Sequence, residues 1–376
     1  MDPIQMVDLK SQYNFIKDEV AHEMKEVLSS TSFINGPIVH EFQKNLEKYL
    51  DVKHVIPCAN GTDALQIALM GLKLLPGDEV ITTDFTFAAT VEVISLLKLN
   101  PILVDVDAKT FNIDPLAIEK AINSKTKAII PVHLFGQVAD MEEILALAKK
   151  YNLFVIEDNA QGIGANYTFS NGTIAKTGTL GHVSATSFFP SKNLGAYGDG
   201  GAIFTNDDDL AHYIRGIVNH GMYKRYYHDI IGVNSRLDAL QAAVLKVKLK
   251  YLDFYNERRK EAALRYTNLL KDHPKIIPPF RKSNCDSHVF HQYTLRILNN
   301  ERDALVNHLN MHQIPYGVYY PVPLHQQKAY VNPKVDSSTF PVTNQLVKEV
   351  ISLPMHSELH LDQIEYICNS ILHFFK

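Results

Sequence analysis

The first two-thirds of the chain alternate between short apolar runs and longer stretches with helical periodicity. The apolar runs, rich in β-branched residues, are residues 54–57, 79–82, 101–106, 128–132, 153–156, 185–188 and 202–205. Runs of this kind are typical of strands buried on both faces of a sheet. Helix-like segments lie between them, at residues 63–72, 140–150 and 208–220. This alternation predicts an α/β fold with a mostly parallel seven-stranded sheet covered by helices.

The last third has a different pattern. One long helical stretch is expected over residues 237–270, and His273-Pro274 marks its exit. Beyond it the pattern predicts strands at 293–297 and 316–319 and helices at 301–311, 344–351 and 361–373. We therefore expect an N-terminal segment and large α/β domain over residues 1–255 and a small C-terminal α+β domain over residues 256–376. Two amphipathic segments, 18–28 and 39–49, precede the sheet and should lie across it or against a partner subunit.

Composition narrows the class of function. A chain of 376 residues with 46% apolar content can fill both domains, and its formal charge of −4 is not gathered into a basic run. This argues against nucleic-acid or membrane binding. Cys58, Cys285 and Cys368 match neither a metal-ligand spacing nor a disulfide framework. With no leader-like or membrane-spanning segment, a cytoplasmic location is expected.

Three motifs for metal or nucleotide binding are absent from the sequence. His356 and His360 are four residues apart, but no Glu follows the first His directly and Pro354 interrupts the approach, so a zinc helix is not predicted. No metal site is expected. Neither a G-x-G-x-x-G turn after a strand nor a P-loop occurs, which excludes nicotinamide and nucleotide-triphosphate chemistry.

The first candidate site motif is Asn60-Gly61-Thr62, where a predicted strand ends and a helix begins. Free N–H groups and the positive end of the helix dipole favour an anion there, and phosphate is the candidate. The same pattern also fits an ordinary turn with Thr62 as a helix cap.

The second motif is Glu157-Asp158-Asn159-Ala160-Gln161, at the end of another predicted strand. Ligands bind at the carboxyl edge of such sheets, and alternating side chains should send Glu157 and Asp158 to opposite faces. A solvated carboxylate or a helix cap is the alternative interpretation.

The third motif is the glycine-rich loop that carries Lys192, directly after the strand at 185–188. A lysine there is partly desolvated and nucleophilic if the loop is buried, and such lysines form Schiff bases with carbonyl compounds. Beside a phosphate cradle, the carbonyl compound is pyridoxal phosphate. A surface lysine remains the alternative for this motif taken alone.

Together the three motifs resemble the DegT/DnrJ/EryC1/StrS sugar aminotransferases, pyridoxal-phosphate enzymes of fold type I, almost from end to end. The resemblance implies that Lys192 forms the Schiff base and acts in catalysis, and that Asp158 pairs with the pyridine nitrogen. It also implies cofactor contacts from the residues at the matching positions, which are Gly61, Thr62, Phe87, Gln161 and Ser187.

The resemblance also implies a homodimer with shared active sites, in which Asn234 reaches the cofactor phosphate of the neighbouring subunit. Arg236 is expected near an anionic part of a substrate, with a structural ion pair as the alternative. The stretch with Tyr319, Tyr320 and His325 resembles a sugar-binding segment that often reads His-Tyr-Pro-x-Pro, so Tyr319 stands in place of the His. Residues 167–178 form a longer insertion than in many relatives, either a surface hairpin or part of the mouth of the site.

The implied activity is transfer of the amino group of L-glutamate to a nucleotide-linked keto sugar. The motifs look most like 3-aminotransferases of UDP-linked 2-acetamido-3-keto sugars, whose 3-amino products serve lipopolysaccharide, lipid A or other surface glycans. A dTDP-3-keto-6-deoxyhexose or a 4-keto sugar remains open as the acceptor. Two other classes also remain open: a non-catalytic regulatory protein on the same fold, and a fold-type-I lyase acting on amino acids.

Overall fold

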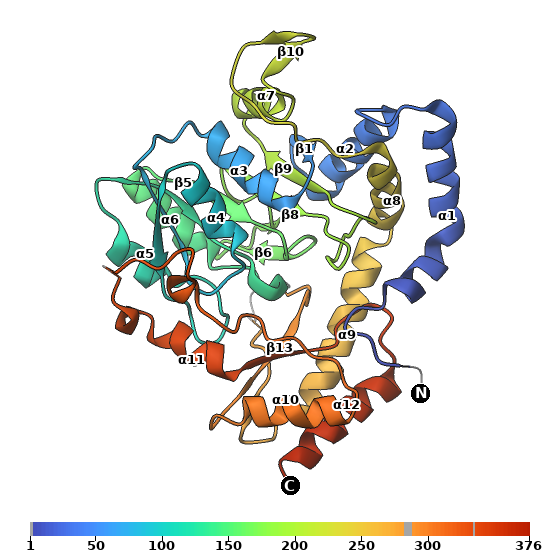
Figure 1. Cartoon of the computed structure of the whole chain (residues 1–376), viewed down its shortest axis with the longest axis vertical. Coiled ribbons are helices and arrows are strands. Elements are labelled where there is room, and N and C mark those ends of the chain that lie inside the picture. Colours follow the sequence, from blue (N-terminus) through green and yellow to red (C-terminus); the bar gives the residue numbers. More distant parts are fainter. Residues whose placement is uncertain (1–2, 282–287, 334) are drawn as a thin grey trace.

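A seven-stranded sheet forms the centre of the larger part of the molecule (Figure 1). The computed structural model describes residues 3–281, 288–333 and 335–376. The sheet contains β1 (His54–Cys58), β2 (Glu79–Thr83), β3 (Asn100–Val104), β4 (Thr126–Ile130), β5 (Phe154–Asp158), β8 (Val183–Ser187) and β9 (Gly201–Thr205). Their order is β1-β9-β8-β5-β4-β2-β3, and only β9 runs against its neighbours. The predicted mostly parallel α/β sheet is confirmed.

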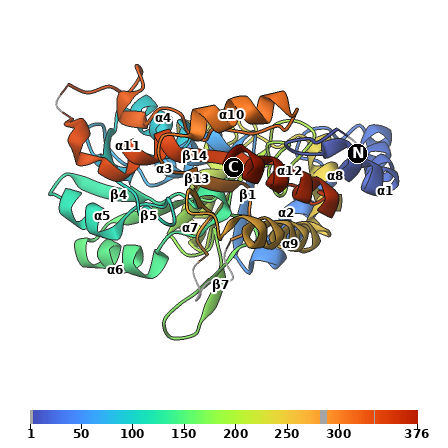
Figure 2. The ribbon, with the colours of Figure 1, turned by 90° about the horizontal axis from the view of Figure 1, so that it is seen from below.

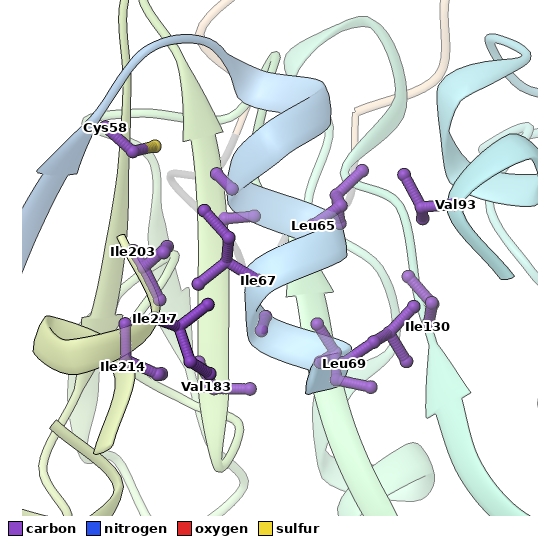
Figure 3. Close-up of a cluster of buried hydrophobic side chains, with 14 of the residues drawn as sticks. Cys58, Leu65, Ile67, Leu69, Val93, Ile130, Val183, Ile203, Ile214 and Ile217 are labelled. Carbon is purple, nitrogen blue, oxygen red and sulfur yellow. The ribbon is translucent and has the colours of Figure 1, made fainter. Parts of the chain in front are cut away.

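Helices cover both faces of this sheet because its side chains alternate between two cores. The helices involved are α3 (Gly61–Gly71), α4 (Ala89–Leu96) and α7 (Asp208–Ile217) on one face and α5 (Pro115–Ala121) and α6 (Met141–Tyr151) on the other. Along β2, Val80 joins the first core and Ile81 the second, as the period of two in a strand requires. In Figure 3, Leu69 of α3 lies next to Ile130 of β4, and Leu65 lies on the side of Val93 of α4. Packing of its apolar side chains against one face of the sheet thus fixes α3, and the first residues of this helix reach the site.

The N-terminal helices pack beside the sheet, against the helical stretch that follows it. They are α1 (Leu9–Ser30) and α2 (Pro37–Leu50), and both contact α8 (Ala239–Leu249) (Figure 1). Val20 of α1 packs on Val244 and Val247. The helical stretch expected over residues 237–270 is present as two helices, because the chain breaks after α8 and resumes as α9 (Leu252–Leu270). The break lets α8 stay with the large sheet while α9 leads to the C-terminal part.

The C-terminal part has its own antiparallel sheet and core. Its strands are β12 (Ile276–Ile277), β13 (Tyr293–Ile297) and β14 (Val350–Leu353), and its helices are α10 (Arg302–Met311), α11 (Pro341–Glu349) and α12 (Leu361–Phe374). Tyr266 of α9, Leu295 of β13 and Ile367 of α12 belong to one buried cluster. The proposed division after residue 255 falls near the start of α9 and stays a proposal.

One predicted strand in this part is wrong, and one predicted helix has different bounds. The strand expected at residues 316–319 is a single bridge between Gly317 and Ser352, after which the chain turns toward the large sheet. The helix expected over residues 344–351 ends at Glu349, since Val350 and Ile351 belong to β14 and pair with β13. In both places long-range pairing decides between helix and strand, and local periodicity does not report it.

The remaining elements are two small hairpins and three 3-10 turns. They are β6 (Asn166–Thr168), β7 (Ile174–Lys176), β10 (Met222–Lys224), β11 (Tyr227–His228), η1 (Leu134–Gly136), η2 (Leu324–Gln326) and η3 (Ser337–Thr339). The insertion at residues 167–178 forms the β6–β7 hairpin, which projects from the molecule in Figure 2.

Two further features concern membrane-spanning helices and cysteines. Across the described ranges, no helix is long and apolar enough to span a membrane. Cys58 and Cys368 are buried free thiols, and Cys285 lies outside the described residues.

Candidate active site

A cavity of about 660 Å³ opens at the carboxyl ends of β1, β2, β4, β5 and β8. The strand ends and the loops after them supply Asn60, Gly61, Thr62, Leu65, Thr86, Phe87, Ala89, Val132, Phe135, Asp158, Ala160, Gln161, Ser187, Phe189, Ser191, Lys192 and Asp199. The C-terminal part adds His291, Gln292, Val318, Tyr319, Tyr320 and Pro321. The three sequence motifs therefore meet at the sheet edge where α/β proteins bind their ligands.

One end of the cavity is built from the start of α3. Asn60 caps this helix, since its Oδ1 accepts a hydrogen bond of 2.8 Å from the N–H of Asp63. Gly61 and Thr62 are the first two residues of the helix, where N–H groups have no partner in the helix itself. A Cβ on Gly61 would lie 2.6 Å from the Cβ of Ser187, so only glycine allows this approach. The result is a small cradle with a hydroxyl on one side and free N–H groups on the other, suited to a phosphate.

Asp158 and Glu157, neighbours at the end of β5, point in different directions as predicted. Asp158 lines the cavity and accepts hydrogen bonds from the Thr90 hydroxyl (2.8 Å) and the Ala160 N–H (3.2 Å). Burial raises the pKa of Asp158, while Thr90, Ala160 and the Lys192 ammonium oppose that rise. Asp158 is thus a buried acid whose charge depends on its partners.

Glu157 is fully buried and does not line the cavity. It accepts hydrogen bonds from the backbone N–H groups of Gly178, Leu180 and Gly181. Its Oε2 also lies 2.9 Å from Nε2 of His133. Because the Ala139 N–H donates to Nδ1 of His133, Nε2 carries the hydrogen and donates to Glu157. Glu157 is therefore a structural acid that holds the end of β5 to the next loop.

Lys192 lies in a tight loop directly after β8. Its own N–H donates to the Phe189 carbonyl (2.8 Å), and a Cβ on Gly195 would lie 2.3 Å from the Pro190 carbonyl oxygen. The loop holds the amine in the cavity wall. Burial lowers the pKa of Lys192 to about 8, although the Asp158 carboxylate acts in the opposite direction. An amine with this pKa is a nucleophile and base near neutral pH.

An aromatic wall closes the cavity on one side. Phe87 is 60% exposed, and its ring lies 6.4 Å from that of Tyr320. Tyr320 also stacks on Phe135 at 6.5 Å. Gln161 ties this wall together, because its Oε1 accepts from the Phe135 N–H (2.5 Å) and its Nε2 donates to the Tyr320 hydroxyl (3.4 Å). A flat apolar surface with a polar amide at its edge fits an aromatic ring that carries a hydroxyl.

The predicted substrate residues divide into two groups. Tyr319 and Tyr320 line the cavity. His325 does not: it is buried beside the cavity, where its Nδ1 lies 2.6 Å from Oδ2 of Asp84 and its Nε2 lies 2.9 Å from the Ser337 hydroxyl. In this position His325 holds the segment that carries Tyr319 and Tyr320 to the end of β2.

Asn234 and Arg236 lie outside the cavity wall of their own chain, and Asn234 is exposed. Ser235, between them, is buried. Its hydroxyl donates to Oδ2 of Asp63 (2.6 Å) and accepts from the Ala59 N–H (3.1 Å). Through Ser235 the segment is thus fixed next to the start of α3.

Several residues of the site were not predicted from the sequence. Thr90 supports Asp158, Asp199 lies on the rim, and His291 with Gln292 comes from the C-terminal part. Asp199 belongs to the glycine-rich loop of Lys192, so its place in the sequence could have indicated that it lies at the site. For Thr90 and His291 no motif marks the residue. Within the described ranges, no cluster of three or more His, Cys, Asp or Glu residues is suited to a metal ion.

These features fit pyridoxal phosphate. The cradle at Gly61 suits its phosphate, the buried Asp158 suits a protonated ring nitrogen, and Lys192 suits its aldehyde. The fold and the cavity together define a pyridoxal-phosphate enzyme of fold type I.

Comparison with known proteins gives the family. The model described as the DegT/DnrJ/EryC1/StrS aminotransferase family matches residues 14–372, and the chain belongs to that family. The "pleiotropic regulatory protein" of Geobacillus stearothermophilus is 46% identical over 99% of each chain. The UDP-2-acetamido-2-deoxy-3-oxo-D-glucuronate aminotransferase of Pseudomonas aeruginosa is 45% identical over 98% of this chain and 99% of its own. The crystal structure of DesV from Streptomyces venezuelae, in complex with a ketimine intermediate, has a TM-score of 0.95 and 36% identity, covering 100% of this chain and 99% of its own.

Proposed function

We propose that this protein transfers the amino group of L-glutamate to the C3 keto group of a UDP-linked 2-acetamido-3-keto sugar. The product is a 3-amino nucleotide sugar for lipopolysaccharide, lipid A or another surface glycan. The similarity to the Pseudomonas aeruginosa 3-oxo-sugar aminotransferase over nearly the whole chain supports this choice of acceptor. The observation that carries the proposal is the meeting of Lys192, Asp158 and the Gly61 cradle in one cavity.

Each of these residues has a definite task. Pyridoxal phosphate, when bound, supplies the electron sink for the pair left behind when a substrate carbon loses its proton. With the cofactor bound, Lys192 would take that proton from the carbon of the amino donor and would return it at the C4′ position of the cofactor. Asp158 would keep a proton on the ring nitrogen. Gly61, Thr62 and Ser187 hold the phosphate. Gln161 donates toward the ring hydroxyl with the amide hydrogen that its bond to Tyr320 leaves free.

The same proposal assigns the surface residues. Phe87 covers the ring, and Tyr319 and Tyr320 contact the sugar. Asn234 and Arg236, which do not line the cavity of their own chain, serve the site of a second copy in a homodimer. In such a homodimer, each site would receive the amide of Asn234 and the guanidinium of Arg236 from the neighbouring subunit.

The acceptor is tested with the cofactor in its amino form. The protein is treated with L-glutamate, freed of excess donor and mixed with UDP- and dTDP-linked 3-keto and 4-keto sugars. We expect the UDP-linked 2-acetamido-3-keto sugar to restore the visible absorption fastest. Preference for a dTDP-3-keto-6-deoxyhexose or for a 4-keto sugar would replace the proposed acceptor with that one.

The attachment point is tested separately. Borohydride reduction followed by peptide mapping should place the cofactor on Lys192. A label on another lysine would overturn the central assignment.

A regulatory function is the second candidate, because one relative carries the name of a pleiotropic regulatory protein. A non-catalytic protein would bind the cofactor and keep its visible absorption unchanged in L-glutamate. Conversion to the amino form at a rate above that of free cofactor would reject this candidate. Release of ammonia from an amino acid without a keto acceptor would instead indicate a lyase.

A further inference from the structure

Asp84 lies directly after β2, and its partner on the C-terminal part is His325. Oδ2 of Asp84 lies 2.6 Å from Nδ1 of His325, and Oδ1 accepts a hydrogen bond of 2.8 Å from the His325 N–H. The backbone carbonyl of Asp84 accepts a third bond, of 3.1 Å, from the Leu324 N–H. Both Asp84 and His325 are buried. Three bonds shielded from water thus join one strand end of the large sheet to the C-terminal part.

The ring of His325 is also fixed on its other sides. It stacks on the ring of Phe340 at 4.6 Å, and its Nε2 lies 2.9 Å from the Ser337 hydroxyl and 3.1 Å from Nε2 of Gln326. Both of these groups can donate, so Nε2 accepts and Nδ1 carries the hydrogen that Asp84 receives. Burial raises the pKa of Asp84, and the bonds from His325 oppose that rise. The carboxylate and the imidazole therefore hold each other in place.

The stretch that lines the cavity lies between two anchors. Residues 318–321 belong to the cavity wall. On one side of them, Gly317 and Ser352 of β14 exchange two backbone hydrogen bonds of 2.9 and 2.7 Å. On the other side is the contact with Asp84. Within the described ranges, residues 318–322 make no backbone–backbone hydrogen bond of their own. The position of this stretch is therefore set at its ends, and Asp84 is its anchor on the large sheet.

The side-chain contacts in the middle of the stretch are less binding. The ring of Tyr320 lies 5.9 Å from that of Phe85 and 6.5 Å from that of Phe135. Its hydroxyl accepts a bond of 3.4 Å from Gln161, which is near the upper limit for a hydrogen bond. The short bonds that join this stretch to the large sheet are those to Asp84.

A second acid, Asp105, binds the C-terminal part at the neighbouring strand end. It follows β3 directly, and its carboxylate accepts from the N–H groups of Val342 (2.8 Å) and Thr343 (2.9 Å) and from the Thr343 hydroxyl (2.7 Å). These residues begin α11, and none of the residues described for that helix lines the cavity. Asp84 and Asp105 thus make similar contacts between the same two parts, but only that of Asp84 adjoins the cavity wall.

We propose that Asp84 is a positioning residue for the acceptor: through His325 it holds Tyr319 and Tyr320 where they contact the nucleotide-linked keto sugar. This inference rests on the proposed function, in which the two tyrosines bind that sugar. A nucleotide sugar is larger than L-glutamate and depends on more of the cavity wall, and binding energy from such remote contacts requires them to be in place beforehand.

The donor step makes a different demand on the site. L-glutamate reacts beside Lys192 and Asp158, and neither side chain has a hydrogen bond to residues 318–322 within the described ranges. The strand end itself is held by the sheet, since the Asp84 N–H donates to the Val104 carbonyl (3.0 Å). Loss of the Asp84 carboxylate therefore releases the tyrosine stretch and leaves the residues of the donor step in place.

The experiment compares two substitutions of Asp84 with one of Asp105. Asp84→Leu has a similar shape and removes both side-chain bonds to His325. Asp84→Asn keeps them, because its Oδ1 accepts from the His325 N–H and its Nδ2 donates to Nδ1 of an imidazole whose hydrogen has moved to Nε2, where the Ser337 oxygen accepts it. Asp105→Leu is the matched control, since it removes the corresponding contact to α11 and leaves the tyrosine stretch anchored.

The first measurement follows the two half-reactions of the holoenzyme separately by stopped-flow absorption. The donor is L-glutamate, and the acceptor is the UDP-linked 2-acetamido-3-keto sugar. We expect Asp84→Leu to raise the apparent Kd for the acceptor about tenfold or more and to change the rate constant with glutamate less than about threefold. Asp84→Asn should stay within about threefold of the wild type in both. Asp105→Leu should leave the ratio between the two half-reactions unchanged.

The second measurement does not depend on activity. It is the hydrogen exchange of the Leu324 N–H, whose acceptor, the backbone carbonyl of residue 84, is present in every variant. Its exchange therefore reports whether the stretch stays at the strand end. We expect Asp84→Leu to speed this exchange about tenfold or more and Asp84→Asn to leave it near the wild-type rate.

The outcomes separate the two proposals. A cofactor-loaded Asp84→Leu protein with the wild-type acceptor Kd overturns the inference, and so do equal losses in Asp84→Leu and Asp105→Leu. If Asp84→Leu does not fold, His325→Leu, which removes the imidazole from the same bond, takes its place, and a wild-type acceptor Kd there has the same meaning. If the wild-type protein reacts with neither glutamate nor a keto sugar, the proposed function fails, while the exchange of the Leu324 N–H still decides whether Asp84 holds the stretch.

Discussion

The hydroxyl of Thr90 donates a 2.8 Å hydrogen bond to Oδ2 of Asp158, and both residues are buried. Thr90 lies at the start of α4 and Asp158 at the end of β5, so two parts of the chain 68 residues apart meet at the acid of the site. Burial alone would favour the protonated form of Asp158. The bond from Thr90 therefore helps to keep the carboxylate charged and able to hold a proton on the cofactor ring.

The first prediction concerns this bond. Thr90→Val keeps the shape of the side chain but leaves one oxygen of Asp158 without its donor, at a cost of roughly 1.5–3 kcal/mol for a bond to a charged group. We expect the pKa of Asp158 to rise and the half-reaction with L-glutamate to slow about tenfold or more. Stopped-flow absorption measures the rate, and Thr90→Ser, which keeps the hydroxyl, is the control. Equal rates in the Val and Ser variants would contradict the assigned role.

Most of the large sheet could be predicted from the sequence because its strands are buried on both faces. Strands of this kind appear in a sequence as continuous apolar runs. For the same reason Gly61, Asp158 and Lys192, which follow such runs, could be placed at one edge of the sheet. Thr90 and His291 could not, since each owes its position to packing between distant segments. The short strand β14, which includes Val350, was not predicted for a related reason. It forms by pairing with β13, and local periodicity carries no information on that pairing.

The second prediction concerns the reactivity of Lys192 in the protein freed of cofactor. Its pKa is lowered to about 8, mainly by burial, from the usual 10.5. Because only the neutral amine reacts, the rate of labelling should rise with pH and level off above about 8, whereas exposed lysines continue to gain reactivity toward pH 10. Trace labelling at a series of pH values, with peptide mapping, gives both curves. A Lys192 curve that coincides with that of exposed Lys44 would show that the burial of Lys192 does not control its proton.

The third prediction concerns the cradle for the phosphate. In Gly61→Ala the new Cβ would lie 2.6 Å from the Cβ and 3.1 Å from the Cα of Ser187, neither of which is a flexible side-chain end. The start of α3 must therefore shift, and we expect cofactor affinity to fall about tenfold or more, the equivalent of 1.4 kcal/mol or above. Titration of the apoprotein with pyridoxal phosphate measures the Kd.

Gly71→Ala is the matched control for that experiment. It lies at the other end of the same helix, and its added Cβ would meet only side-chain atoms of Ile214 and Leu210, the nearest at 2.9 Å. These side chains can adjust, and alanine is favoured over glycine within a helix. Loss of affinity in Gly71→Ala to the same extent as in Gly61→Ala would mean that helix stability, and not the cradle, controls cofactor binding.

The last prediction concerns Lys248 in α8, a buried lysine away from the cavity. Its Nζ has no hydrogen-bond partner among the described residues and faces the ring of Tyr197 at 5.5 Å. Burial, aided by the Arg259 guanidinium, lowers the pKa of Lys248 to about 7. Between about pH 7 and the usual lysine value, the unfolded chain binds the proton more tightly than the folded one. In that pH range Lys248 makes the free energy of unfolding increase with pH. Below about pH 7 the amine is charged in both states, and the full free-energy cost of burying its charge destabilises the folded protein.

Lys248→Met removes this cost and keeps a side chain of similar length. We expect the variant to be more stable than the wild type at pH 6.5, by about 1 kcal/mol or more, and the difference to shrink toward pH 9.5. Thermal midpoints at fixed protein and cofactor concentration measure it, with the exposed Lys44→Met as a control that should change little at either pH. A Lys248→Met protein less stable than the wild type at pH 6.5 would show that the amine has a buried partner, such as an ordered water, that makes its charge favourable.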